Sequence, residues 1–169
     1  LFNRGEIQRR INKSVAEKIP GCLAMIDIDN FKQINDNYGH KEGDNVIKGV
    51  SYVIRKVLDE TGLSGISASD VRASEVFETS ETLSSCGVDA NLTQDLLNVK
   101  TPVGRWGGEE FMVLLQGVPI ELAVDFANKV CRAFNELSFE KAGNRSMSVG
   151  VTEIRAGESS DEACVRVDQ

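Results

Sequence analysis

The sequence has little of what marks several common classes of protein. It contains one histidine and four cysteines, which are far apart and form no CxxC pair: Cys22, Cys86, Cys131 and Cys164. Zinc sites and disulfide frameworks are therefore poorly supported, and we expect the reduced thiols of a cytoplasmic protein. No apolar run reaches the ~20 residues needed to span a bilayer, and no signal peptide pattern is visible.

An excess of basic residues is also missing, since the formal net charge is −7. An acidic chain repels a nucleic-acid backbone, so nucleic acid is not an expected partner. A nucleotide substrate stays open, because a metal ion can neutralise its phosphates locally. The 169 residues fit one domain. The chain starts at Leu1 rather than Met and ends at Gln169, from which we expect a piece of a longer protein.

Apolar periodicity predicts an alternation of helices and strands. The predicted elements are a helix through Ile7, Ile11 and Val15, a buried strand over 23–28, a helix over 46–58, a strand–turn–strand unit over 103–115, a helix over 123–137, a strand over 147–152 and a helix that starts at Ser159–Glu162. Gly107 and Gly108 are expected to supply the positive φ angles of a two-residue hairpin turn. This order predicts an α/β (α+β) sandwich, with helices packed on a central mixed or antiparallel sheet.

The segment at about 60–100 differs from the rest of the chain. It is rich in Ser, Thr, Asp and Glu and weakly patterned, with short helices predicted near 71–83 and 92–99. It is too long for an ordinary connection in a compact domain. We therefore predict one domain over 1–169 with an insertion at about 60–100, which is either a regulatory flap or a tolerated surface excursion.

Three acidic residues stand where predicted strands end. Asp27 ends the buried strand, and Glu109 and Glu110 follow the two glycines of the hairpin. If these strands are neighbours, the carboxylates converge at one rim and repel each other unless a cation lies between them. Oxygen ligands suit Mg²⁺ or Mn²⁺, which can hold phosphates and activate a hydroxyl. The alternative is solvated acids at strand ends.

Several separated motifs together resemble the GGDEF family of diguanylate cyclases, with a signature that reads GGEEF. They are Asp27–Asp36, Tyr38–His40, Gly43-Asp44 and Arg105–Phe111, with Leu1–Arg4 and Ser148–Val151 similar to the family's opening motif and last core strand. The resemblance covers nearly the whole chain except the insertion. It implies a single GGDEF-type domain, truncated at both ends, with a ferredoxin-like palm related to nucleotide cyclases.

The resemblance also implies roles for the acids and a lysine. Asp27 matches the metal ligand, and the carbonyl of Ile28 adds a backbone oxygen. Glu109 matches the acid that binds metal and helps to deprotonate the attacking 3′-hydroxyl, and Glu110 matches a supporting acid, with an outward-pointing strand residue as the alternative. Lys32 matches a lysine that neutralises the phosphates, against the alternative of a solvated helix lysine.

Asn35 and Asp44 match the residues that read guanine. One carboxylate can accept hydrogen bonds from both N1–H and the N2 amino group of guanine, whereas adenine presents an acceptor at N1. Such a site rejects the base that lacks those donors. The alternative for Asp44 is the N-cap of the helix that starts at Val46.

The remaining substrate positions implied by the resemblance are Phe31, His40, Gly107 and Gly108. The two glycines allow the nucleotide to approach the backbone closely. His40 is open to a structural role in a turn. For Asp29, a structural hydrogen-bonding role is favoured over metal binding.

The implied function is a diguanylate cyclase that condenses two GTP into cyclic di-GMP and pyrophosphate with Mg²⁺ or Mn²⁺, as a twofold dimer of cytoplasmic domains. Sensor domains or a membrane anchor are expected in the full-length protein. The main alternative is a catalytically silent module that binds GTP or cyclic di-GMP. Less favoured are a cyclase of another base specificity and a plain interaction domain.

The chain departs from the family pattern in two places. An Arg-x-x-Asp motif, where product binds and inhibits in many members, is replaced by Asn98 and Thr101. Both charges are missing, so we predict no product inhibition at that site. Asp168 matches an acid of the last helix, but the basic residues that usually follow are absent, so weak activity of this chain is expected.

Overall fold

The computed structural model describes residues 1–63 and 101–168 of the chain. In chain order they form α1 (Arg4–Ala16), β1 (Gly21–Ile28), α2 (Phe31–Tyr38), α3 (His40–Glu60), β2 (Val103–Arg105), β3 (Glu110–Gln116), α6 (Ile120–Asn135), β4 (Ser138–Phe139), β5 (Gly143–Asn144), β6 (Met147–Glu153) and α7 (Ser160–Val167). The predicted insertion and the helices predicted near 71–83 and 92–99 fall wholly or largely outside the described residues.

The main sheet has four strands in the order β2-β3-β1-β6, and every pairing between these strands is antiparallel. Helices α2 and α3 follow β1, a tight hairpin links β2 to β3, and α6 lies between β3 and β6. This is the ferredoxin-like β-α-β-β-α-β arrangement. The prediction of helices on a mixed or antiparallel sheet is therefore confirmed, in its antiparallel form.

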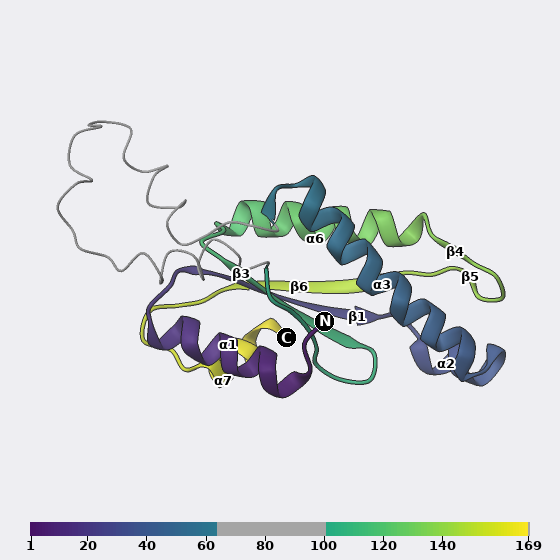
Figure 1. Ribbon diagram of the computed structural model, residues 1–169, viewed down its shortest axis with the longest axis horizontal. Coiled ribbons are helices and arrows are strands. Elements are labelled where there is room, and N and C mark those ends of the chain that lie inside the picture. Colours follow the sequence, from purple (N-terminus) through teal and green to yellow (C-terminus); the bar gives the residue numbers. More distant parts are fainter. Residues whose placement is uncertain (64–100, 169) are drawn as a thin grey trace, which may run out of the picture.

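Helices cover both faces of this sheet (Figure 1): α3 and α6 pack on one face, and α1 and α7 on the other. Side chains of a strand alternate between faces. In β1, Cys22, Ala24 and Ile26 belong to the core under α3 and α6, whereas Leu23 and Met25 belong to the core under α1 and α7. Burial on both faces explains why β1 is a continuous apolar run.

The long helix α3 starts earlier than its apolar periodicity predicts. Its first residue is His40, preceded by Gly39 at φ 83°, a conformation that glycine adopts without steric cost. Asp44 thus lies inside the helix and is exposed, so the alternative of an N-cap at Asp44 is wrong. The short helix α2, which buries Phe31 and Ile34, and the small β4–β5 hairpin were not predicted.

The turn between β2 and β3 differs from the predicted two-residue turn. Neither Gly107 nor Gly108 has a positive φ, and the last paired residues are Arg105 and Phe111. The amide of Trp106 donates to the Glu110 carbonyl at 2.8 Å, which leaves three residues in the turn. A Cβ on Gly107 would lie 2.1 Å from Oε2 of Glu110. The absent side chain of Gly107 therefore makes room for the Glu110 carboxylate.

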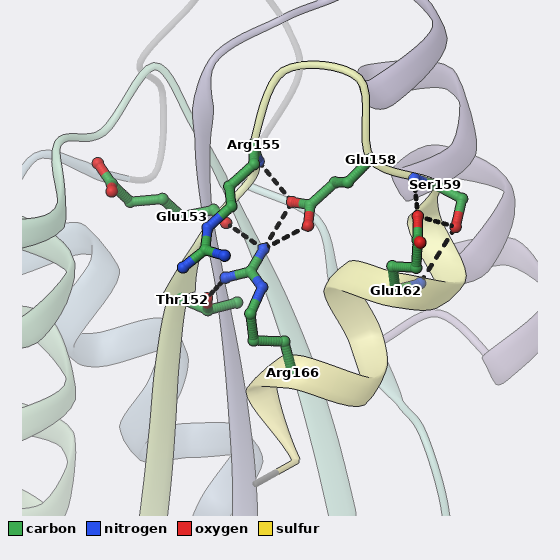
Figure 2. A network of polar contacts seen from close by, with 7 residues as sticks. All are labelled: Thr152, Glu153, Arg155, Glu158, Ser159, Glu162 and Arg166. Atoms are coloured by element: carbon green, nitrogen blue, oxygen red, sulfur yellow. Dashed lines mark hydrogen bonds and ion pairs between the residues drawn. The ribbon is translucent and has the colours of Figure 1, made fainter.

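Helix α7 is fixed at its start and along its length by polar contacts (Figure 2). Ser159 and Glu162 form a capping box, which confirms the predicted helix start. Arg166 then pairs with Glu158 at 2.6 Å and donates to the hydroxyl of Thr152 on β6. This network joins α7 to the sheet and places Asp168 at the end of the helix. None of the described helices is long and apolar enough to cross a membrane.

Candidate functional site

Two carboxylates face each other at the end of the two central strands. Asp27 of β1 and Glu110 of β3 are Cα partners in the antiparallel register. By alternation, both side chains lie on the face covered by α1 and α7. Glu110 is half-buried, but Asp27 is exposed, because the helices of this face cover Leu23 and Met25 and not the end of the strand. The strand that Asp27 ends is buried as predicted, but the Asp27 carboxylate itself is exposed.

Neither acid of this pair has an ion-pair partner among the described residues, and both are perturbed by desolvation and by other acids. Desolvation and the charge of Asp29 raise the pKa of Asp27 above its ordinary value, and Asp168 acts in the same direction. Desolvation and the charge of Asp27 likewise raise the pKa of Glu110, with further contributions from Asp168 and Glu109. In residues 1–63 and 101–168, no lysine, arginine or histidine forms an ion pair with either carboxylate.

Glu110, rather than Glu109, occupies the position opposite Asp27. Glu109 is half-buried in the turn immediately before β3, close enough for its charge to raise the pKa of Glu110. Of the three acids predicted to converge, the strand register brings Asp27 and Glu110 together at one rim of the sheet. The division of roles between the two glutamates stays a prediction.

A cavity of about 320 Å³ lies beside Glu110, between α1, the β2–β3 turn and α7. Its lining includes Arg4, Trp106, Glu110 and Asp168. The guanidinium of Arg4 stacks over the Trp106 ring, with 4.7 Å from Cζ to the centroid. The charge of Arg4 also lowers the pKa of Glu110. Sequence reasoning missed Arg4, because the stack depends on a partner about one hundred residues away.

The donor set of this rim fits a hard divalent cation. Within the described part of the chain, no three His, Cys, Asp or Glu side chains are grouped so as to hold a metal ion by themselves. Mg²⁺, however, usually keeps several waters and binds through one or two carboxylates together with substrate phosphates. Asp27 and Glu110, whose pKa values are both raised by desolvation and by neighbouring acids, offer that pair. The residues present therefore fit Mg²⁺ or Mn²⁺ bound jointly with a nucleotide.

Asp29 has structural partners. Its carboxylate accepts from the hydroxyls of Ser146 at 2.5 Å and Ser148 at 2.8 Å, and its amide donates to the Ser146 carbonyl at 3.1 Å. The next residue, Asn30, has a left-handed φ of 57° and turns the chain into α2. These contacts agree with the structural role favoured for Asp29.

The helices α2 and α3 bring the two predicted guanine-reading positions together. Asn35 on α2 lies against Gly43 of α3, where a Cβ would be 2.0 Å from Oδ1 of Asn35. Asp44 is the next residue. Phe31 is buried in the core and its ring lies beside the same glycine, so it supports this contact between the helices. A direct contact between Phe31 and substrate stays a prediction.

Lys32 and His40, the other predicted site residues on these helices, are both exposed. Lys32 lies in the first turn of α2, shortly after the end of β1, and His40 is the first residue of α3. Thr101, one of the two positions of the missing product-binding motif, is buried and its hydroxyl donates to the Leu63 carbonyl. Asn98, the other, lies outside the described residues.

Comparisons with known proteins place the chain in a family. The family model described as "Diguanylate cyclase, GGDEF domain" matches residues 1–66 and 88–169. Diguanylate cyclase DgcM of Escherichia coli (strain K12) is 30% identical over 146 residues, which are 86% of this chain and 26% of that protein. Probable diguanylate cyclase DgcT of the same organism is 41% identical over 132 residues, or 77% of this chain and 21% of that protein. The chain thus spans about a quarter of the length of these relatives.

Solved structures agree on the fold. The active GGEEF domain of a diguanylate cyclase from Vibrio cholerae superposes with a TM-score of 0.69 at 23% identity, covering 100% of this chain and 87% of that one. The GGDEF domain of DgcB from Caulobacter crescentus, solved in complex with c-di-GMP, gives a TM-score of 0.69 at 21% identity, covering 98% of this chain and 80% of that one. With its palm-like sheet, its facing acids and its matched family profile, this chain belongs to the GGDEF domain family of diguanylate cyclases.

Proposed function

We propose that this domain condenses two molecules of GTP into cyclic di-GMP and pyrophosphate. The observation that carries the proposal is the pairing of Asp27 with Glu110 at the rim of the sheet, beside a glycine turn and within the fold of this family. Such a pair is poorly placed for stability, because desolvation and neighbouring acids raise the pKa of both carboxylates: Asp29 and Asp168 act on Asp27, and Asp27 acts on Glu110. Acids whose pKa values are perturbed by desolvation and by specific charged neighbours are candidates for a functional site.

A divalent cation at this rim, Mg²⁺ or Mn²⁺, would supply Lewis-acid stabilisation of charge on the phosphates. Asp27 and the Ile28 carbonyl would hold it from β1 and Glu109 from the turn, with Glu110 of β3 in a supporting role. The Glu109 carboxylate also takes the proton of the attacking 3′-hydroxyl. A bond forms from O3′ to the α-phosphorus of the second GTP, and the bond from that phosphorus to the bridging oxygen breaks, so pyrophosphate leaves with the electron pair. Lys32 offsets the charge that grows on the leaving group.

Guanine is selected by residues of α2 and α3, which form one wall of the site. Asn35, fixed against Gly43, and Asp44 hydrogen-bond the edge of the base, with His40 nearby on the same helix. Asp44 accepts from N1–H and from the N2 amino group, which adenine does not offer. The absence of side chains at Gly107 and Gly108 lets the nucleotide lie close to the backbone of the turn.

The product requires two such reactions, so two domains face each other across a twofold axis. Each contributes one bound GTP, and each 3′-hydroxyl attacks the α-phosphate held by the other domain. Sensor domains elsewhere in the full-length protein would regulate this encounter. A single domain binds GTP and does not complete the ring.

The test is incubation of the protein with GTP and Mg²⁺, with the products separated by chromatography and identified by mass. Cyclic di-GMP and pyrophosphate are expected, at a rate that rises faster than linearly with protein concentration. A protein that binds GTP and forms no phosphodiester at any concentration would instead be the silent binding module. A product that contains adenine from mixed nucleotides would show another base specificity.

A further inference from the structure

Glu42 is a buried carboxylate that the proposed reaction does not use. It lies in the first turn of α3 with only 3% of its surface exposed. Its Oε1 accepts the amides of Lys141 at 2.9 Å and Ala142 at 3.0 Å, and its Oε2 accepts from Asn45 at 3.1 Å. These hydrogen bonds favour the charged form and lower the pKa of Glu42. A carboxylate this well partnered fixes the position of the backbone it contacts.

That backbone links β4 to β5. Residues just outside the link contact α2 and α3 at two further points. The guanidinium of Arg145 stacks on the Tyr38 ring of α2 at 5.5 Å and donates to its hydroxyl at 3.3 Å. The ring of Phe139 lies where a Cβ on Gly49 of α3 would be 2.7 Å away. Figure 1 shows the hairpin at the end of α6, on the side of the molecule that carries α2. The hairpin therefore joins the ends of α2 and α3 to the strand that follows it.

The strand that follows the hairpin is β6, which pairs with β1, the strand that carries Asp27. Ser146 and Ser148 hold the Asp29 carboxylate, and Ser148 is the Cα partner of Asp27. One continuous segment, residues 141–148, thus contacts the guanine-reading wall at its start and the acidic rim at its end. Glu42 is the charged group at the first of these contacts, directly before Gly43 and Asp44.

We propose that Glu42 is a positioning residue. It holds the start of α3 at a fixed place relative to the acidic rim. Asp44, and the contact between Asn35 and Gly43, are thereby held in place as well. This inference rests on the proposed function, in which those two residues read guanine. Loss of the carboxylate leaves a buried amide at Ala142 without a partner. Loss of a hydrogen bond to the base through movement of the base-reading residues costs ~5- to 100-fold in affinity.

The experiment measures the Kd of GTP and of ITP in the presence of Mg²⁺ by calorimetry, for the wild type, Glu42→Ala and Glu42→Gln. Inosine lacks the N2 amino group of guanine. Glu42→Ala is expected to weaken GTP binding by about 10-fold and ITP binding by less, so that base discrimination falls. Glu42→Gln keeps an amide oxygen that can accept both amides and is expected to restore most of the affinity. Glu60→Gln, an exposed acid at the far end of α3 whose partner Lys56 lies 3.8 Å away, is the matched control and should bind as the wild type does.

A folded Glu42→Ala protein with unchanged Kd and unchanged discrimination would overturn the inference, as would equal weakening of GTP and ITP. If Glu42→Ala does not fold, Arg145→Ala takes its place, because it releases the same hairpin from α2. This variant is also expected to reduce the discrimination between GTP and ITP. An unchanged ratio of the two Kd values in Arg145→Ala overturns the inference as well. If the wild type binds GTP without forming cyclic di-GMP, the proposed function fails while the binding comparison still decides the role of Glu42. A wild type that does not bind GTP overturns both.

Discussion

The substitution Gly43→Ala is expected to stabilise helix α3 and, at the same time, to weaken the binding of guanine. Alanine in the interior of a helix is favoured over glycine by about 1 kcal/mol, so the change should stabilise α3 taken alone. The new Cβ, however, would lie 2.0 Å from Oδ1 of Asn35, whereas such contacts essentially never fall below 3.0 Å. The Asn35 side chain must therefore retreat by about 1 Å, which is enough to break a hydrogen bond to the guanine edge.

The size of the effect follows from that hydrogen bond. Leaving a polar group of the site unpaired costs about 1–3 kcal/mol, which corresponds to a loss of about 5- to 100-fold in affinity for GTP. The protein itself should melt at or above the wild-type temperature. The assay is calorimetric titration with GTP and Mg²⁺, together with thermal unfolding of the same preparations.

A double-mutant cycle gives the decisive comparison. Asn35→Ala alone should weaken GTP binding to a similar extent. In that background Gly43→Ala should cost no further affinity, because the two Asn35 atoms that the Cβ would meet first are gone and the nearest remaining atom, Cζ of Phe31, is 3.2 Å away. Wild-type affinity in Gly43→Ala would refute the reasoning, and so would a double variant whose loss is the sum of the two single losses.

Three further predictions follow from the same structure. Desolvation and the neighbouring acids raise the pKa of Glu110 above its ordinary 4.5. The folded state therefore keeps the proton of Glu110 to a higher pH than the unfolded state does. As the pH rises from 4.5 through the raised pKa, the free energy of unfolding falls. Metal-free Glu110→Gln should therefore gain stability over the wild type from acid to neutral pH in a series of thermal melts, and a pH-independent difference would argue against it. Glu158→Ala, which removes the 2.6 Å partner of Arg166 shown in Figure 2, should cost about 2 kcal/mol in urea unfolding; an effect near zero would mean that the network does not hold α7. Added cyclic di-GMP should leave the initial rate unchanged, because Asn98 and Thr101 lack the charges of a product site; inhibition abolished by replacing either residue would contradict this.

Long amphipathic elements could be predicted from the sequence, because their signal is local. The helix through Ile7 and Ile11, the apolar run of β1 and the capping box at Ser159 all appeared where periodicity and capping chemistry placed them. The helix α2 was missed because eight residues with only Phe31 and Ile34 buried carry too short a pattern. The strands β4 and β5 have two residues each and offer no alternation to detect.

The candidate site shows a different limit. The sequence motifs indicated which acids belong to the candidate site. The pairing of Asp27 with Glu110, however, depends on the register between two strands, and these residues are more than eighty positions apart in the sequence. Glu42 resembles any polar residue near the start of a helix, and its partners lie 99 and 100 residues away. Gly107 was predicted to have a positive φ angle, whereas in the structure its φ is not positive and its missing side chain leaves space for the Glu110 carboxylate. Contacts of this kind follow from the tertiary fold, which local patterns do not specify.

The claim on which the account depends is that the rim formed by Asp27 and Glu110 carries the chemistry. The most direct measurement is the initial rate of cyclic di-GMP and pyrophosphate formation from GTP and Mg²⁺ for the wild type and for Asp27→Asn, with both proteins shown to be folded by circular dichroism. We predict product from the wild type and a rate lower by about 100-fold or more for Asp27→Asn. A folded Asp27→Asn protein that keeps the wild-type rate would contradict the account.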